Sequence, residues 1–229
     1  MAQQFTNTAI LEQKSFMSKV YGLMAMGLLI TAVISFLVST NQILVAYLFS
    51  NKFLYIMLFV VELFIVGYLA SRVRYMKYST AINLFIAYSV INGITLSFIF
   101  LAYTRASIFS AFFTTAGMFG IMSIYGYTTK KDLASVGNFL FMGLIGIIIA
   151  SIVNIFMRNS VFDLLISILG VIIFTGLTAY DTQKIKNYLF LNSNSEEDKK
   201  SAIMGALTLY LDFINLFLML LRLMGRSRN

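Results

Sequence analysis

The sequence predicts an all-α integral membrane protein with seven transmembrane helices, folded as a single domain over residues 1–229. Of the 229 residues, 59% are hydrophobic and only 11% are charged, whereas about 25% of the residues of a soluble domain are charged. The mean hydropathy is +0.86. Seven segments also reach the roughly 20 mostly apolar residues that a helix needs to cross a bilayer.

Taken in order along the chain, the predicted spans are 20–38, 53–70, 82–103, 108–127, 139–156, 161–181 and 203–223. The apolar stretch 43–49 is too short to cross, so we expect it to join the first loop or to lengthen the second helix. The first span is an anchor rather than a signal peptide, because its apolar run exceeds the usual 7–15 residues or so and no A-x-A-like cleavage site follows it.

Lysine and arginine residues indicate the orientation. Eleven of them lie in the amino-terminal segment and in the second, fourth and sixth loops, whereas the opposite loops hold one each and the tail holds three. Short loops rich in these residues stay in the cytoplasm. We therefore predict a short cytoplasmic segment at 1–18 and an outside carboxyl-terminal tail at 225–229. The formal charge of +8 then reflects topology rather than nucleic-acid binding.

Missing residue types narrow the chemistry. The chain has no cysteine and no histidine, which are the usual ligands of zinc, haem and iron–sulfur clusters and the usual partners in Ser-His and Cys-His catalysis. We therefore expect that the protein is not an enzyme and holds no resident cofactor. The remaining carboxylates and backbone carbonyls suit protons and hard cations such as calcium.

Small residues recur every fourth position in several spans, as with Gly27, Thr31 and Ser35 in the first and Ser89 and Gly93 in the third. This spacing lets helix backbones approach closely where no hydrophobic effect drives their association. We interpret these residues as helix-packing positions. Proline is absent, so no span is predicted to be broken.

Two carboxylates, Asp181 and Asp212, lie in the last two spans. A charge at bilayer depth costs from roughly 2.5 to more than 10 kcal/mol, so such a residue marks a functional site by default. Thr178 shares a helical face with Asp181, and Thr208 and Asn215 share one with Asp212. Polar stripes on successive antiparallel helices meet most economically by facing each other, which predicts one shared ionisable centre.

Other charged residues have simpler interpretations beside the functional ones. Arg72 and Arg74 end the second span, where either could be a counter-charge to Asp181 or a plain result of the positive-inside rule. Glu62, three turns away on that helix, is a third buried carboxylate, either an ion ligand or a packed, protonated carboxyl. The charged cluster 196–200 is most simply a solvated loop.

The strings GLTAYDTQKIK and LYLDFINLFLMLLR closely resemble the Bax inhibitor-1 family, also called the transmembrane Bax-inhibitor-motif family. TAGMFGIMSIYGYTTKKDL and INGITLSFIF are similar to its bacterial inner-membrane branch. The similarity extends from about residue 21 to residue 225, which is nearly the whole chain.

The resemblance implies a central seventh helix surrounded by the other six, and a pH-sensitive calcium leak. Asp181 and Asp212 match two family aspartates that share a hydrogen bond, sense pH and would meet the calcium ion. Arg72 or Arg74 matches an arginine that latches the sixth-helix aspartate in the closed state, and Glu62 matches an acidic residue along the ion pathway. The chemistry fits independently, because two carboxylates in a low-dielectric site tend to hold one proton between them.

Two other classes of function compete. An intramembrane aspartyl protease also uses aspartates on its sixth and seventh helices, but its Gly-x-Gly-Asp motif reads Leu-Tyr-Leu-Asp at 209–212, and its Pro-Ala-Leu motif is impossible without proline. A regulatory protein that restrains a membrane protease or a stress-response partner, as reported for some relatives, stays open. The expected partners are therefore the bilayer, calcium and protons and, under this last alternative, a membrane protease or other membrane protein, with no nucleic acid.

Overall fold

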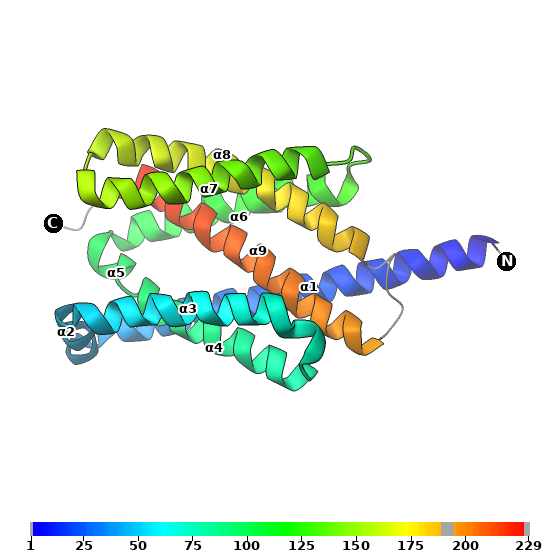
Figure 1. The fold of residues 1–229 in the computed structure, drawn as a ribbon, viewed down its shortest axis with the longest axis horizontal. Helices are drawn as coiled ribbons and strands as arrows, with labels where there is room; N and C mark the ends of the chain where they lie inside the picture. Colours follow the sequence, from blue (N-terminus) through cyan, green and yellow to red (C-terminus); the bar gives the residue numbers. More distant parts are fainter. Residues whose placement is uncertain (1, 189–194, 227–229) are drawn as a thin grey trace. The chain divides into compact units, whose positions relative to one another are not determined.

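The protein is described here by a computed structural model covering residues 2–188 and 195–226, which are almost entirely helical (Figure 1). The elements in order are α1 (Ala2–Thr40), α2 (Gln42–Ser50), α3 (Lys52–Arg72), the 3₁₀ turn η1 (Val73–Tyr75), α4 (Tyr78–Leu96), α5 (Ile99–Ala102), α6 (Arg105–Thr128), α7 (Ala134–Met157), α8 (Ser160–Tyr188) and α9 (Ser195–Met224).

The predicted fold class is confirmed. Within these residues there is no β-strand, and seven helical stretches are long and apolar enough to cross a membrane. They are Leu11–Thr40, Lys52–Tyr75, Tyr78–Ala102, Arg105–Thr128, Ala134–Met157, Ser160–Asn187 and Glu196–Met224. Each contains or overlaps one of the seven spans predicted from the sequence.

The last helix begins earlier than predicted. The helix α9 begins at Ser195, so the cluster 196–200 forms its first turns rather than a loop. Acidic side chains in a first helical turn are favourable because they face the positive end of the helix dipole. At the other end of the chain, α1 begins at Ala2 and continues into the first span, and the cytoplasmic location of residues 1–18 stays a prediction.

The stretch 43–49 is also neither loop nor extension. It lies within α2, a nine-residue helix of its own. The cause is a pair of asparagines, since Asn41 Oδ1 accepts the amide hydrogens of Ile43 and Leu44 at 3.1 Å, and Asn51 Oδ1 accepts that of Leu54 at 3.1 Å. A side-chain oxygen at the N-cap satisfies amides that would otherwise lack a partner, so each asparagine begins a new helix.

The third span is interrupted, although the chain has no proline. The helix α4 ends at Leu96, a turn follows, and α5 begins at Ile99. Ser97 Oγ donates to the Ile94 carbonyl at 2.7 Å. A serine hydroxyl that bonds a carbonyl one turn earlier offers the backbone an alternative to the helical ladder, so the expectation of an unbroken span was wrong here.

The described chain divides into two compact units. The first lies within Met1–Ala102 and Tyr188–Tyr210, and the second within Tyr103–Asn187 and Leu211–Asn229. The first unit therefore holds α1 to α5 with the amino-terminal half of α9, and the second holds α6, α7, α8 and the carboxyl-terminal half of α9. The single domain predicted from the sequence stays a prediction.

In the first unit, α1 packs along α4 through the small residues singled out in the sequence. A Cβ on Gly93 would meet the Thr31 carbonyl oxygen and Ile34 Cβ, each at 2.8 Å. A Cβ on Gly27 would meet the Phe85 ring at 2.7 Å. Both glycines are thus required by the close approach of the two helices, which confirms their interpretation as packing positions.

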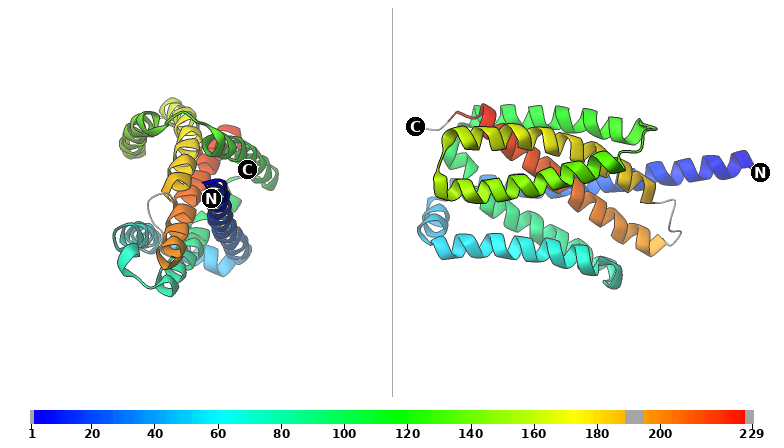
Figure 2. Two further views of the ribbon diagram at one scale, coloured as in Figure 1. Left: turned by 90° about the vertical axis from the view of Figure 1, so that its right-hand side faces the viewer. Right: turned by 45° about the horizontal axis from the view of Figure 1, so that its top comes forward.

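In the second unit, α7 and α8 lie side by side after a tight turn (Figures 1 and 2). Arg158 ends α7 in the left-handed conformation, with φ of 51°. Asn159 Oδ1 then accepts the amide hydrogens of Val161 at 2.9 Å and Phe162 at 3.1 Å, which begins α8. This turn sets the direction of the helix that carries Asp181.

The last helix is much more buried than the others. About 72% of the most apolar 18-residue window of α9 is buried, against at most 50% for the other six spanning helices. Its residues Leu207, Leu209, Leu216 and Leu221 are all at most 1% exposed. Most of the α9 surface is therefore covered by protein, and the central place expected of the seventh span stays a prediction.

Candidate functional site

Asp181 on α8 and Asp212 on α9 lie close enough for their carboxyl groups to act on each other's charge. Both residues lie in the second unit. An ionised carboxylate only accepts hydrogen bonds, so a direct hydrogen bond between the two groups would require a proton on one of them. The proton shared by the pair stays a prediction.

Asp212 is the more deeply buried partner, with 5% of its surface exposed, whereas Asp181 is half-buried. The Oδ2 atom of Asp212 is buried and has no hydrogen-bond partner among the described residues. An unsatisfied buried acceptor costs roughly 1–3 kcal/mol. A proton or a cation at Oδ2 would remove that cost, so this is the atom at which either is expected to bind.

A hydrophobic cluster holds the two helices together beside the pair. Leu177 lies one turn before Asp181, and Leu216 lies one turn after Asp212. The buried members of the cluster come from α7, α8 and α9 and are Leu140, Phe174, Leu177, Leu216, Met219 and Leu220. Because these side chains are buried together, the carboxyls are brought together by apolar packing rather than by their own attraction.

The backbone around Asp181 is anchored by polar contacts to α6 and to the loop after it. Thr182 and Ser123 hydroxyls are 3.0 Å apart. Gln183 Oε1 accepts the Leu133 amide hydrogen at 2.9 Å, and Gln183 Nε2 donates to the Lys131 carbonyl at 2.8 Å. The two residues that follow Asp181 thus both bond to other parts of the unit.

Glycines bring the neighbouring helices close to the same segment. A Cβ on Gly126 of α6 would collide with the backbone carbonyl of Ala179, and a Cβ on Gly137 of α7 would collide with the Tyr180 ring. Residues 179 to 183 are therefore held from several sides, and Asp181 is presented from a fixed stretch of backbone.

Lys184 is a partner that sequence reasoning missed. Its ammonium group acts electrostatically on Asp181 and lies 5.6 Å from the centre of the Tyr180 ring. The spacing of three residues from Asp181 to Lys184 on a helix was the available signal. The sequence predicts the counter-charge on the second span instead, at Arg72 or Arg74.

The latch candidates Arg72 and Arg74 lie in the first unit, at the end of α3 and in η1, and both side chains are exposed. The Arg74 carbonyl accepts a hydrogen bond from Lys200 Nζ at 2.7 Å. Because Asp181 belongs to the second unit, the latch stays a prediction. Glu62, also in the first unit, is 7% exposed.

The polar residues expected to support the pair bond within their own helices. Thr178 Oγ1 donates to the Phe174 carbonyl at 2.8 Å, Thr208 Oγ1 to that of Met204 at 3.0 Å, and Asn215 Nδ2 to that of Leu211 at 2.8 Å. Each contact reaches one turn back along the helix. The stripe is therefore largely satisfied locally, and these donors do not hold the carboxyls.

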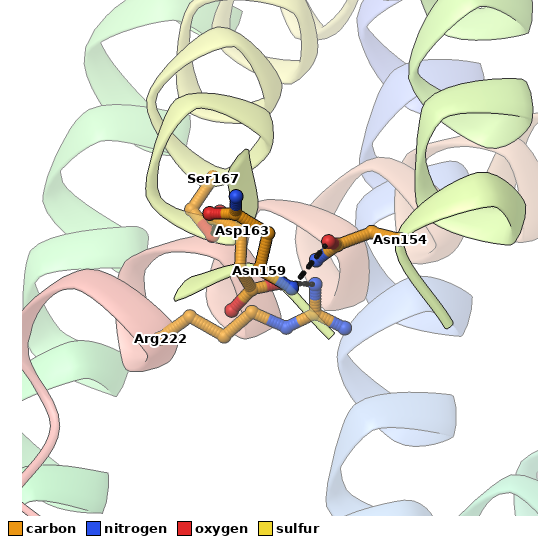
Figure 3. A network of polar contacts seen from close by, with 5 residues as sticks. All are labelled: Asn154, Asn159, Asp163, Ser167 and Arg222. Atoms are coloured by element: carbon orange, nitrogen blue, oxygen red, sulfur yellow. Dashed lines mark hydrogen bonds and ion pairs between the residues drawn. The ribbon is translucent and has the colours of Figure 1, made fainter. Parts of the chain in front are cut away.

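The two stripes meet a second time at the opposite end of α8 (Figure 3). Arg222 Nη1 lies 3.5 Å from Asp163 Oδ1, and about half of each side chain is exposed. Asp163 sits in the first turns of α8, where Ser167 Oγ donates to its carbonyl at 2.8 Å. This ion pair links the first turn of α8 to the last turn of α9.

No group of three or more histidine, cysteine, aspartate or glutamate side chains gathers anywhere in residues 2–188 and 195–226. A calcium ion at the pair would therefore have two carboxyls and would need carbonyl or water oxygens to complete the six to eight ligands it usually takes. The assignment of Asp181 and Asp212 as calcium ligands stays a prediction.

Comparison with known proteins agrees with this architecture. The family described as "Inhibitor of apoptosis-promoting Bax1" matches residues 13–229. A protein of Borreliella burgdorferi is 48% identical over 96% of this chain and 95% of its own length. The inner membrane protein YbhL of Escherichia coli is 46% identical over 94% of this chain and 93% of its own length, and a protein of Rickettsia prowazekii is 43% identical over 94% and 91%. The chain is a member of the Bax inhibitor family of membrane proteins.

Proposed function

We propose that the protein is a pH-sensitive, calcium-permeable leak, in which the pair formed by Asp181 and Asp212 senses protons. The observation that carries the proposal is the proximity of these two carboxyls inside membrane-spanning helices, where each acts on the other's charge and Asp212 Oδ2 is buried and unpartnered. Buried ionisable groups at such positions are costly and are kept for ion or proton pathways.

The chemistry follows from the number of protons on the pair. With one proton, the two carboxyls bond to each other, and the packing of α8 against α9 is retained. When that proton leaves, two negative charges lie side by side in a low-dielectric site and repel each other. A hard cation with oxygen ligands then relieves the repulsion, in competition with Lys184 and with the proposed latch, Arg72 or Arg74. Calcium binding and proton binding at the pair are thus linked.

The remaining assignments belong to the same proposal. Glu62 lies along the ion pathway, and Thr178, Thr208 and Asn215 line the polar stripes. The chain works in the bacterial inner membrane with its amino terminus in the cytoplasm and its carboxyl terminus outside, in keeping with the inner-membrane relative YbhL. It performs no catalytic reaction and holds no resident cofactor.

The test is calcium entry into dye-loaded liposomes that contain the purified protein alone, measured across a pH series. Asp181→Asn and Asp212→Asn each remove the shared titration, so the flux of either variant should vary less with pH near neutrality than that of the wild type. Asp163→Asn is the matched control, because it makes the same chemical change on α8 at a half-exposed position outside the pair. It should leave the pH profile unchanged.

Two outcomes would reject the proposal. If the double variant Asp181→Asn/Asp212→Asn keeps both the flux and the pH dependence of the wild type, the carboxyls are structural. If the wild-type protein alone conducts no calcium, the function belongs to the other class, a regulatory membrane protein that acts on a membrane protease or a stress-response partner.

A further inference from the structure

A second buried carboxyl, Glu62, lies in the first unit and has neutral partners. Its Oε1 accepts the Thr95 hydroxyl at 2.7 Å, and its Oε2 lies 3.3 Å from the Asn92 amide nitrogen. Within the described chain Glu62 forms no ion pair. The basic residues of its own helix, Lys52 and Arg72, are ten positions away on either side, or about 15 Å along the axis.

Beyond Asn92, the contacts of Glu62 continue through two more side chains. Tyr210 OH lies 3.0 Å from Asn92 Oδ1 and 2.7 Å from Thr31 Oγ1, and Thr31 Oγ1 lies 2.8 Å from the Ser89 carbonyl oxygen. Tyr210 is 0% exposed, Thr31 is 3% exposed and Asn92 is 7% exposed. A buried polar chain thus runs from Glu62 on α3 through Asn92 on α4 and Tyr210 on α9 to Thr31 on α1.

When Glu62 is ionised, this chain of polar side chains has one hydrogen fewer than it has hydrogen-bonding contacts. It contains four successive hydrogen-bonding distances, from Glu62 Oε2 to Asn92, to Tyr210, to Thr31 and to the Ser89 carbonyl. The Asn92 amide can donate on only one of its two sides, and each hydroxyl holds one hydrogen. An ionised Glu62 and the Ser89 carbonyl only accept. Three hydrogens therefore serve four contacts.

A proton on Glu62 completes the chain. Which end of an asparagine amide is oxygen is assigned from its hydrogen bonds rather than observed. With the Asn92 amide turned over, its nitrogen donates to Tyr210, Tyr210 donates to Thr31, and Thr31 donates to the Ser89 carbonyl. Asn92 Oδ1 then faces Glu62 Oε2, a contact between two acceptors unless Glu62 carries the fourth hydrogen. Each contact then has one proton, and all point the same way.

We propose that Glu62 is a second proton-binding site, in which the Asn92 amide and the Tyr210 and Thr31 hydroxyls stabilise the protonated carboxyl. The inference goes beyond the proposed leak and does not depend on it. Leaving one buried contact without a hydrogen costs roughly 1–3 kcal/mol, and a charge without a counter-ion at membrane depth costs more. Both effects favour the neutral acid.

The other titratable groups around Glu62 do not compete for this role. Those that interact with it electrostatically are Tyr55 on α3, Tyr88 on α4 and Tyr210 on α9, and α1 contributes the neutral Thr31. A tyrosine in a model peptide titrates near pH 10 or so. Glu62 is therefore the carboxylic acid among these described groups, and its hydrogen-bonding partners are a hydroxyl and an amide.

The proton also has a structural consequence. Losing it favours the opposite orientation of the Asn92 amide, in which the nitrogen donates to Glu62 and Tyr210 donates to Asn92 instead of to Thr31. The direction in which the Tyr210 hydroxyl points thus reports the charge on Glu62. This couples Glu62 to α9, the helix that also carries Asp212 two residues further on.

Infrared spectroscopy of the reconstituted protein tests the proposal, because a protonated carboxyl has its own C=O stretching band. The full chain is prepared with and without ¹³C in the glutamate carboxyl groups, and spectra are recorded across a pH series. The label shifts glutamate bands and leaves those of the aspartate pair in place. The other glutamates, Glu12, Glu196 and Glu197, have exposed side chains.

We expect a label-shifted band at neutral pH that disappears in Glu62→Gln. Tyr210→Phe, which removes one link of the chain, should move the band or its midpoint, whereas Tyr75→Phe, at a side chain that is 84% exposed, should not. The absence of any label-sensitive band at neutral pH in the wild type would overturn the proposal without reliance on a variant's folding. A band that survives Glu62→Gln, or one equally indifferent to both tyrosine changes, would overturn it as well.

Discussion

The close approach of α6 to α8 gives a sharp prediction for two glycines of one helix. A Cβ on Gly126 would collide with the Ala179 carbonyl, whereas a Cβ on Gly120, less than two turns earlier, meets no atom within 4 Å. A backbone carbonyl cannot turn aside as a flexible side chain can, so in Gly126→Ala the two helices must separate. The matched change Gly120→Ala alters the same atoms in open space.

We expect Gly120→Ala to stabilise the protein and Gly126→Ala to destabilise it. Alanine in place of glycine within a helix stabilises by about 1 kcal/mol at most, and this is the whole effect expected of Gly120→Ala. Gly126→Ala has the same gain but also an overpacking cost of about 1–3 kcal/mol. Separation of the helices also weakens the contact between Ser123 and Thr182, 3.0 Å apart, which is worth about 0.5–1.5 kcal/mol. The gain is common to both variants, so we expect Gly126→Ala to be less stable than Gly120→Ala by the sum of the two costs, about 1.5–4.5 kcal/mol.

Denaturant titration of both variants in the same detergent, followed by circular dichroism, measures the difference. Because Ala179 lies two residues before Asp181, we also expect Gly126→Ala to disturb the pH profile of calcium flux and Gly120→Ala to leave it unchanged. Equal stabilisation by both changes would refute the close approach. A destabilised Gly126→Ala with an unaltered pH profile would instead refute the idea that the packing of this segment positions Asp181.

Three further predictions follow from the contacts. Gln183→Leu leaves the Leu133 amide without its side-chain acceptor, which is 2.9 Å away in the wild type. It should lower the free energy of unfolding by about 1–3 kcal/mol in the same titration, and no change would mean that water replaces the glutamine. A double-mutant cycle with Asp163→Asn and Arg222→Gln should give a coupling below about 1 kcal/mol, because the half-exposed pair is 3.5 Å apart, and a larger value would show that lipid shields it. Reporters fused at the carboxyl terminus and in the connection between α8 and α9 should give opposite compartments, and the same compartment from both would contradict the predicted topology.

The length of the hydrophobic runs determined most of what the sequence could predict. Seven runs predicted seven spans, because about twenty mostly apolar residues are the length that a helix needs to cross a bilayer. The boundaries were less accurate, since they depend on single side chains such as Asn41, Asn51 and Ser97, whose hydrogen bonds begin or end helices within apolar sequence. These residues carry no hydropathy signal strong enough to move a span, although asparagine at an N-cap is a known preference.

The site was predictable in part. The helical period placed Asp181 and Asp212 on polar faces, and consecutive antiparallel helices have few ways to arrange two such faces. The period does not say which helix lies beside a given face, so the partners of Glu62 were not predictable. Asn92 follows Glu62 by thirty residues, and Tyr210 is 118 residues beyond Asn92.

The last helix explains why buried polar groups accumulate in this chain. Tyr210 and Asp212 are two residues apart, and at 3.6 residues per turn their side chains leave α9 about 200° apart. One takes part in the network of the first unit and the other in the pair of the second. Both side chains are buried, with 0% of Tyr210 and 5% of Asp212 exposed. Because both proposed proton-binding sites include a residue of α9, a change in either site acts on the same helix.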